Sequence, residues 1–312
     1  MTKSAAWRSA MASDPGRVRS ENQDRGYADD ELGIFLVVDG LGGHAAGEKA
    51  AEMAVGTVIE VLGTEDGDPK ERICRAITAA NNRICEEAAT NETWRGMACV
   101  LTLALISDEK VFVGHVGDSR LYLTWNGAIR KLTSDHSPVG EREDAGELNE
   151  AEAMAHPRRN EVFRDVGSRK RLADEEDFIE VKEFLFKPDA AILLCSDGLS
   201  DLLTSAEILN VMERYEGDPE RVARELVEEA NLAGGADNIT AIFIAGSEFL
   251  GNSSPSAAEA RARNAITKAR DDEAPARAKG AVARALTTRV AFLIYGFVIG
   301  VALALALRWP KP

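Results

Sequence analysis

The sequence is poor in several residues and motifs that common chemistries require. Its four cysteines form no C-x-x-C pair and its four histidines show no metal-ligand spacing, which argues against a zinc cluster and against a disulfide framework. It has no G-x-x-x-x-G-K-[ST] phosphate loop and no G-x-S-x-G nucleophile motif. The N-terminal segment lacks the continuous apolar run of a secretory signal. These absences favour a reducing compartment for most of the chain.

Basic residues are fewer than acidic ones. The 312 residues include 37 Lys+Arg and 52 Asp+Glu, a net charge of −15, so we expect no nucleic-acid partner. A hydrophobic share of 45% fits a globular protein and excludes wholesale disorder. From Ser247 onward ten basic and five acidic residues give +5, which leaves −20 for residues 1–246. Such an excess of carboxylates either faces solvent or surrounds cations.

One long apolar run lies near the C-terminal end. Residues 290–307 contain no charge and are flanked by Arg289 and Arg308. As a helix they would extend about 27 Å, enough for a bilayer core, whereas a buried core helix is rarely apolar on all sides. We therefore expect a single-pass anchor in the cell membrane. More basic residues precede the run than follow it, which predicts that the large N-terminal part is cytoplasmic.

The rest of the chain divides by composition into a globular part, residues 1–246, and a polar Ala/Arg-rich linker, residues 247–289, before the anchor at 290–307. Strand-like runs occupy residues 34–38, 99–106, 110–116, 121–125, 178–186, 191–195 and 239–245. Helical periodicity occupies residues 47–62, 69–89, 205–215 and 219–233. Because strands follow one another directly while helices come in pairs, we expect antiparallel sheets with helices outside them.

Four short segments place an aspartate where an apolar run meets glycine or a small polar residue. They are Val37-Val38-Asp39-Gly40, Val116-Gly117-Asp118-Ser119, Cys195-Ser196-Asp197-Gly198 and Ala236-Asp237-Asn238-Ile239. Any one of them could be an ordinary turn aspartate. Together with Asp24 they suggest that carboxylates gather at strand ends, where a hard dication finds carboxylate and backbone carbonyl oxygens. Any catalysis would then depend on metal ions.

The stretch from Gly40 to Ala45 also matches a loose dinucleotide-binding fingerprint, G-x-G-x-x-A. We disfavour that interpretation, because Asp39 would place a carboxylate beside the pyrophosphate and Glu60, about 20 residues on, lies within a predicted helix. The four histidines are interpreted as structural.

Six ordered motifs carry a resemblance to a known family. They are Arg19-Ser20-Glu21-Asn22-Gln23-Asp24, Val38-Asp39-Gly40-Leu41-Gly42-Gly43-His44, Val116-Gly117-Asp118-Ser119-Arg120, Leu132-Thr133-Ser134-Asp135-His136-Ser137, Cys195-Ser196-Asp197-Gly198-Leu199 and Asp237-Asn238-Ile239-Thr240. From about Val18 to Ile244 the chain resembles the metal-dependent protein phosphatases (PPM, protein phosphatase 2C-like), in particular the bacterial serine/threonine branch. The resemblance implies an α+β fold, a four-layer α-β-β-α sandwich with two central antiparallel sheets, to which we add the C-terminal transmembrane helix.

The resemblance also assigns metal ligands. It makes Asp39 the carboxylate that bridges two Mn²⁺ or Mg²⁺ ions, with the carbonyl of Gly40 on one of them. Asp197 and Asp237 hold the other ion. A third, weaker site involves Asp118 together with Asp197.

Two further residues are assigned in the same way. Asp24 matches an acid that binds near the cluster through metal-bound water, and Arg19 matches the arginine that grips the substrate phosphate. A guanidinium offers phosphate two parallel hydrogen bonds, so the match agrees with the chemistry of the residue.

The implied reaction is hydrolysis of phosphoserine and phosphothreonine in proteins, by in-line attack of water activated between two metals. The sequence departs from the family at two places. Some members have a histidine two residues after the first metal-binding aspartate, whereas this chain has Leu41. Where the family usually has Gly-Thr-Thr, this chain has Gly96-Met97-Ala98. The resemblance also implies that residues 138–155 are a mobile flap, and this segment is strongly acidic. The expected protein is a membrane-tethered phosphatase that opposes a cognate serine/threonine kinase.

The alternative is a catalytically weak adaptor of the same fold that binds phosphoproteins. Degenerate members lose metal carboxylates, whereas Asp39, Asp118, Asp197 and Asp237 are all present here. The sequence therefore favours the enzyme.

Overall fold

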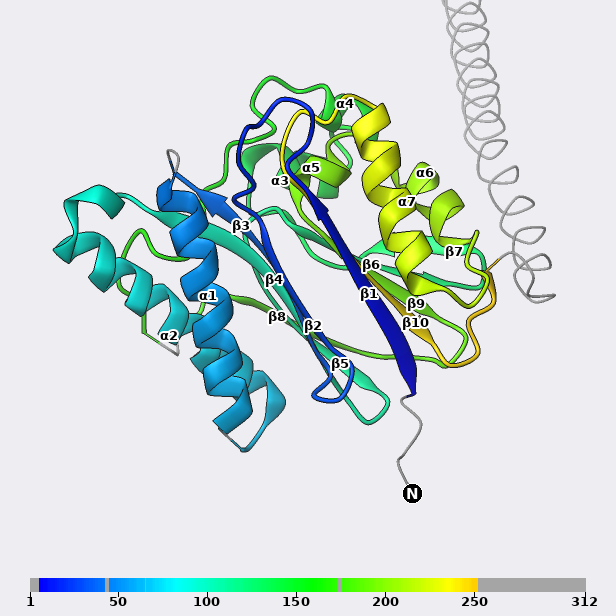
Figure 1. The fold of residues 1–312 in the computed structure, drawn as a ribbon, viewed down its shortest axis with the longest axis horizontal. Coiled ribbons are helices and arrows are strands. Elements are labelled where there is room, and N and C mark those ends of the chain that lie inside the picture. The colour runs from blue at the N-terminus through cyan, green and yellow to red at the C-terminus, as the bar shows by residue number, and fades with distance from the viewer. Residues whose placement is uncertain (1–5, 43–44, 65, 173–174, 252–312) are drawn as a thin grey trace, which may run out of the picture. The chain divides into compact units, whose positions relative to one another are not determined.

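A computed structural model describes residues 6–42, 45–64, 66–172 and 175–251. Two five-stranded antiparallel sheets form the centre of the fold (Figure 1). The first has the order β1 (Trp7–Asp14), β10 (Ile239–Gly246), β9 (Ala191–Cys195), β6 (Arg120–Trp125) and β7 (Ala128–Lys131). The second has the order β2 (Arg25–Asp29), β3 (Ile34–Leu41), β4 (Ala98–Ser107), β5 (Lys110–Val116) and β8 (Glu180–Leu185).

Helices cover the outer face of each sheet (Figure 1). The pair α1 (Ala45–Thr64) and α2 (Pro69–Thr90) packs on the second sheet, against β3 and β5. The pair α6 (Ser205–Met212) and α7 (Pro219–Leu232) packs on the first, against β7, β1 and β10. The remaining helical turns are η1 (Glu92–Trp94), α3 (Pro138–Asp144), α4 (Glu150–Met154) and α5 (Asp197–Ser200). The α-β-β-α layers are therefore present, and α3 and α4 lie within the acidic segment 138–155.

Local sequence signals explain where these helices begin. Asp68 caps α2, since its carboxylate accepts hydrogen bonds from the amides of Lys70 and Glu71, and a proline follows it at the first helical position. Asp218 does the same for α7, again with proline next. Thr204 and Glu207 form a capping box at the start of α6.

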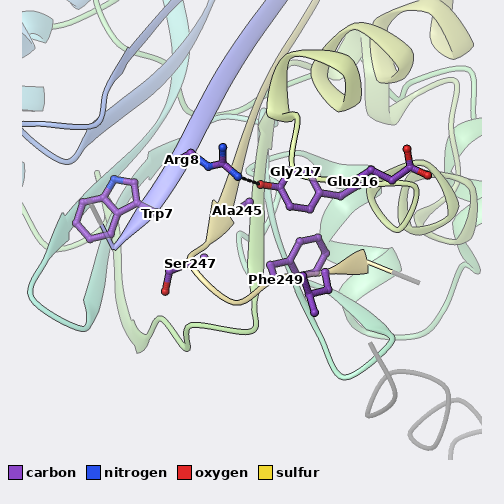
Figure 2. A pocket seen from close by; sticks show the side chains of 10 residues that line it. Trp7, Arg8, Glu216, Gly217, Ala245, Ser247 and Phe249 are labelled. Carbon is purple, nitrogen blue, oxygen red and sulfur yellow. Dashed lines mark hydrogen bonds between the residues drawn. The ribbon is translucent and has the colours of Figure 1, made fainter. Parts of the chain in front are cut away.

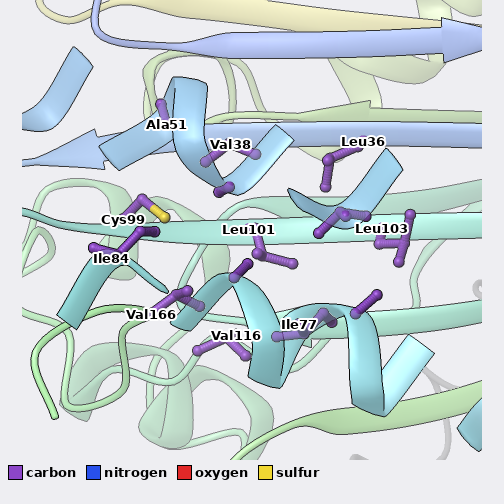
Figure 3. Close-up of a cluster of buried hydrophobic side chains, with 14 of the residues drawn as sticks. Leu36, Val38, Ala51, Ile77, Ile84, Cys99, Leu101, Leu103, Val116 and Val166 are labelled. Carbon is purple, nitrogen blue, oxygen red and sulfur yellow. The ribbon is translucent and has the colours of Figure 1, made fainter. Parts of the chain in front are cut away.

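Strand alternation divides the core between the layers. In β3, Leu36 and Val38 face α1 and α2, while Phe35 and Val37 face the other sheet, as the two-residue period of a strand requires. Figure 3 shows Leu36 and Val38 beside Leu101 and Leu103, with Ile77 of α2 packed onto the strands. Because β3 is buried on both faces, its amino-acid sequence is a nearly continuous apolar run and does not alternate with polar residues. This rigid centre fixes the positions of the strand ends.

The predicted fold was wrong in its last element, the transmembrane helix. Within the described ranges no helix is both long and apolar enough to cross a membrane. The two longest, α1 and α2, carry charges such as Glu48, Glu60 and Arg72 along their length, which a bilayer core would not accept. Residues 290–307, on which the prediction rested, lie outside the described residues.

Packing between α2 and the second sheet can be tested at Ile77, which is fully buried. Ile77→Ala should lower the free energy of unfolding by about 2–5 kcal/mol, because the lost methyl groups leave a cavity that the sheet cannot fill. Urea denaturation followed by circular dichroism measures the change. The control Leu232→Ala alters a side chain that is 79% exposed and should cost less than about 0.5 kcal/mol. Equal losses for the two variants would contradict this packing.

Candidate metal centre

The aspartates predicted at strand ends come together at one end of the two sheets. Asp39 lies near the end of β3 and Asp118 in the turn between β5 and β6. Asp197 follows β9 by two residues, and Asp237 precedes the antiparallel β10 by two. A cavity of about 270 Å³ is lined by these four residues together with Arg19 and Gly40. The structure thus brings six of the seven predicted site residues into one cavity.

Asp24, the seventh, lies behind the cavity and does not line it. Its side chain is 2% exposed and accepts a hydrogen bond from Ser196 Oγ at 2.7 Å. The other oxygen, Oδ1, is buried and has no hydrogen-bond partner within the described residues. Burial raises the pKa of Asp24 to about 6. The Oδ1 atom of Asp24 can therefore accept a hydrogen bond from a metal-bound water or interact with a positively charged group.

Two glycines let the backbone close tightly around the site. A Cβ at Gly40 would lie 2.3 Å from the carbonyl oxygen of Gly47, so the end of β3 can lie against the first turns of α1 only without a side chain. A Cβ at Gly198 would lie 2.0 Å from the carbonyl oxygen of Asn238. The contact between Gly198 and Asn238 brings the neighbouring residues Asp197 and Asp237 close together.

Electrostatics make the cluster unfavourable without a cation. Burial, and then repulsion from Asp24 and Asp197, raises the pKa of Asp39 well above its usual range. Burial together with the charge of Asp118 has the same effect on the pKa of Asp197. Burial and the charge of Asp135 raise the pKa of Asp118 to about 7. Each carboxylate therefore resists ionisation beside the others.

The donor set fits Mg²⁺ or Mn²⁺. It consists of oxygens only, from carboxylates and from the backbone of Gly40, which lines the cavity, and such hard ligands suit these ions. Asp197 Oδ1 is buried and has no hydrogen-bond partner within the described part of the chain, as expected of an atom whose partner is a metal.

Arg19 is the cationic group of the cavity. Its Nη2 donates to Asp237 Oδ2 at 2.8 Å, and more than half of its side chain is exposed. Since Asp237 uses only one corner of the guanidinium, further N–H groups remain for an anion that enters the cavity.

Sequence reasoning missed Asp201 and Asn238. Asp201 lies beside Asp118 and Asp197 in a small adjoining cavity and accepts a hydrogen bond from Arg159 at 2.7 Å. Its spacing of four residues from Asp197 is a signal that could have been used, because residues four apart share a helix face. Asn238 directly follows Asp237 and holds the neighbouring loop. The adjacent Asp-Asn pair could have suggested a supporting role.

The side chains of two histidines and one glutamate also lie close together. The hydrogen bonds of the two histidines indicate a structural role. His115, His136 and Glu180 have ligand atoms within 4.8 Å of one another. The two ring nitrogens of His115 already bond Thr102 and Ser134, and Nδ1 of His136 accepts from a backbone amide. These bonds leave His115 no free nitrogen for a metal.

A second and larger cavity, of about 680 Å³, lies at the opposite end of β1 and β10 (Figure 2). There Arg8 donates a hydrogen bond to the Tyr215 hydroxyl at 3.2 Å, and Glu216 is the single carboxylate in the lining. One carboxylate does not make a dication site. The smaller cavity at Asp39 is therefore the candidate centre.

Comparisons with known proteins give the family of this chain. Residues 17–230 match the family described as Protein phosphatase 2C. The serine/threonine phosphatase Stp of Listeria welshimeri is 34% identical over 243 residues, covering 74% of this chain and 92% of the relative. The crystal structure of PstP from Mycobacterium tuberculosis superposes with a TM-score of 0.69 at 30% identity, covering 77% of this chain and 98% of that one. A structure of the PstP catalytic domain contains two manganese ions and superposes with a TM-score of 0.65 at 29% identity, covering 77% and 97%.

The two antiparallel sheets with outer helices, and the carboxylate cavity at their end, are those of a metal-dependent phosphatase. The chain belongs to the protein phosphatase 2C family.

The burial of Asp118 beside the charges of Asp135 and Asp201 predicts a stability change in Asp118→Asn. A carboxyl whose pKa rises on folding holds its proton more tightly when folded, so stability falls as the pH rises from 3.8 to about 7. In EDTA at pH 8 the variant should therefore melt at least about 2–4 °C above the unaltered chain. At pH 5 most of this advantage should vanish, because Asp118 is then protonated in the folded chain.

Thermal melting followed by circular dichroism checks this prediction. Asp177→Asn, at an exposed turn outside the cluster, is the control and should leave the melting temperature unchanged at both pH values. A melting temperature of Asp118→Asn at or below that of the unaltered chain at pH 8 would contradict it.

Proposed function

We propose that the protein hydrolyses phosphoserine and phosphothreonine in proteins, with two Mn²⁺ or Mg²⁺ ions at the candidate centre and a third, weaker site beside them. The observation that carries the proposal is the single cavity in which Asp39, Asp197 and Asp237 face Arg19. Relatives at 34% and 32% identity are named serine/threonine phosphatases, and a related catalytic domain binds two manganese ions.

The resemblance to the metal-dependent phosphatases assigns the residues that would hold the ions, and most of them line one cavity. Asp39, the carbonyl of Gly40, Asp197 and Asp237 would hold two ions. Asp118 and Asp197 would hold the third, and Asp24 would act from behind the cavity through water. When bound, divalent cations lower the pKa of coordinated water and neutralise phosphate oxygens.

Arg19 binds and orients the substrate. Asp237 holds its guanidinium over the cavity, so the remaining N–H groups can donate to two phosphate oxygens at once. These hydrogen bonds neutralise negative charge on the phosphate as the phosphorus–oxygen bond breaks, and they hold the phosphate in the cavity that the carboxylates line. The exposure of Arg19 leaves room for a phosphorylated side chain on a protein surface.

The adaptor alternative has no observation in its favour. An adaptor does not need a buried cluster of mutually repelling carboxylates, and here the predicted carboxylates are retained and gathered at one place.

We also propose the setting in which the enzyme works. Its cysteines are free thiols, which fits a cytoplasmic catalytic domain. A phosphomonoester of serine or threonine must be made by a kinase, so a serine/threonine kinase is the expected source of its substrates. Membrane attachment is no part of this proposal.

Activity of the full chain tests the function. With Mn²⁺ it should hydrolyse p-nitrophenyl phosphate and a phosphothreonine peptide, and Asp39→Asn should reduce kcat/KM by at least about 10³-fold through loss of metal-dependent catalysis. Arg19→Ala should reduce kcat/KM by about 10²–10³-fold, because a charged donor to the phosphate is lost. Phosphate release measures both.

The matched control is Arg17→Ala, an exposed arginine two residues from Arg19 that does not line the cavity, and it should retain nearly full activity. The function would be disproved by a chain with bound Mn²⁺ that is no faster than Asp39→Asn. Equal losses for Arg17→Ala and Arg19→Ala would remove the role given to Arg19.

A further inference from the structure

The loop that carries Arg19 has little regular structure to hold it. It comprises residues 15–24, between the end of β1 and the start of β2. In the described part of the chain, one backbone–backbone hydrogen bond fixes its interior, from Arg17 N to the Gly235 carbonyl at 2.7 Å. Phosphate binding requires a guanidinium held in one place, so the loop needs other support.

Arg25 supports the C-terminal end of the loop, since it donates to the carbonyls of Asn22 and Asp24. The side chain of Asn238 supports both sides of Arg19. Its Nδ2 donates to the carbonyl oxygens of Pro15 at 2.9 Å and Glu21 at 2.8 Å, and its Oδ1 accepts from the amide of Gln23 at 2.8 Å. The side chain amide thus bonds one residue before Arg19 and two after it. Asn238 is 6% exposed, so these bonds form away from water.

The partners also fix which way the amide points. Backbone carbonyls can only accept and a backbone N–H can only donate, so only one orientation of the Asn238 amide satisfies all three bonds. Aspartate has the same shape but no donor, and it would face the two carbonyl oxygens with a negative charge. Alanine would leave all three backbone groups unpaired, which is costly in a buried place.

We propose that Asn238 is a positioning residue that holds the loop 15–24 so that Arg19 stays over the metal-binding carboxylates. Its neighbour Asp237 accepts the hydrogen bond from Arg19, so a single two-residue turn both clamps the loop and provides the carboxylate. The turn itself is held by the close contact between Gly198 and the Asn238 carbonyl. The inference rests on the proposed function, because it assigns Arg19 to the phosphate.

Asn81 offers a matched control elsewhere in the fold. It is fully buried, its Oδ1 accepts from Gly167 N at 2.8 Å, and its Nδ2 donates to the Arg169 carbonyl at 2.8 Å. The same kind of side chain therefore holds a different loop with the same kind of bonds.

Trypsin measures the clamp directly, without any need for activity, because it cuts after Arg17 and Arg19 only when the loop leaves its place. In the full chain, Asn238→Ala and Asn238→Asp should each speed cleavage at these two bonds by at least about tenfold, as expected when several buried hydrogen bonds are lost. Asn81→Ala should instead speed cleavage after Arg169 and leave the Arg17 and Arg19 bonds unchanged. Unchanged cleavage after Arg17 and Arg19 in both Asn238 variants would overturn the proposal.

A double-mutant cycle then shows whether the clamp acts through Arg19. With Mn²⁺ and p-nitrophenyl phosphate, Arg19→Ala should cost about 100-fold in kcat/KM in the unaltered chain and in Asn81→Ala, but less than about threefold in Asn238→Asp. The same cost in all three backgrounds would mean that Asn238 is merely structural.

Two further outcomes are distinguishable. If the unaltered chain with Mn²⁺ hydrolyses nothing, the proposed function fails, while trypsin still decides whether Asn238 clamps the loop. If neither Asn238 variant folds, hydrogen exchange on the unaltered chain decides: the Gln23 amide should exchange at least about tenfold more slowly than an unprotected loop amide. Unprotected exchange at Gln23 would overturn the clamp.

Discussion

The burial of several carboxylates in one place is the constraint on which the rest of this structure depends. Asp39, Asp118 and Asp197 are brought together from three different strand ends, where burial raises the pKa of each and the charges of neighbouring aspartates raise it further. Such an arrangement costs folding free energy when no cation is present, and only a rigid scaffold can hold it. The apolar core between and outside the two sheets provides that rigidity, since its strands are buried on both faces.

Antiparallel pairing explains why residues far apart in sequence meet at one place. The end of β9 and the start of β10 lie side by side because the two strands run in opposite directions, so Asp197 and Asp237 become neighbours. The β2–β3 pair does the same for Asp24 and Asp39. A loop at this edge can then add a positively charged group to the carboxylates, which is the position that Arg19 occupies.

Much of the centre could be predicted from sequence, because each aspartate lies in or within two residues of a buried strand and is marked by a glycine or a small residue. The helices capped by Asp68 and Asp218 were predictable for the same reason, since capping is local. Strand β1 was missed: it is a sheet edge with alternating polar residues, and β10, more than 220 residues away, determines its pairing. Asn238 was missed because its role depends on carbonyl groups that only the folded loop brings near. The transmembrane helix was predicted from the length and apolarity of residues 290–307 and from the arginines that flank them, and nothing in the described residues supports it.

The pairing of β1 with β10 has a consequence for the order in which the protein can be made. Trp7 pairs with Gly246, so β1 cannot pair until β10, more than 220 residues later, has been synthesised. Until β10 is made, β1 has no neighbouring strand. The loop of Arg19 then lacks its hydrogen-bond partners Asp237 and Asn238. During synthesis, therefore, Arg19 gains the neighbours that hold it only after most of the described domain has been made.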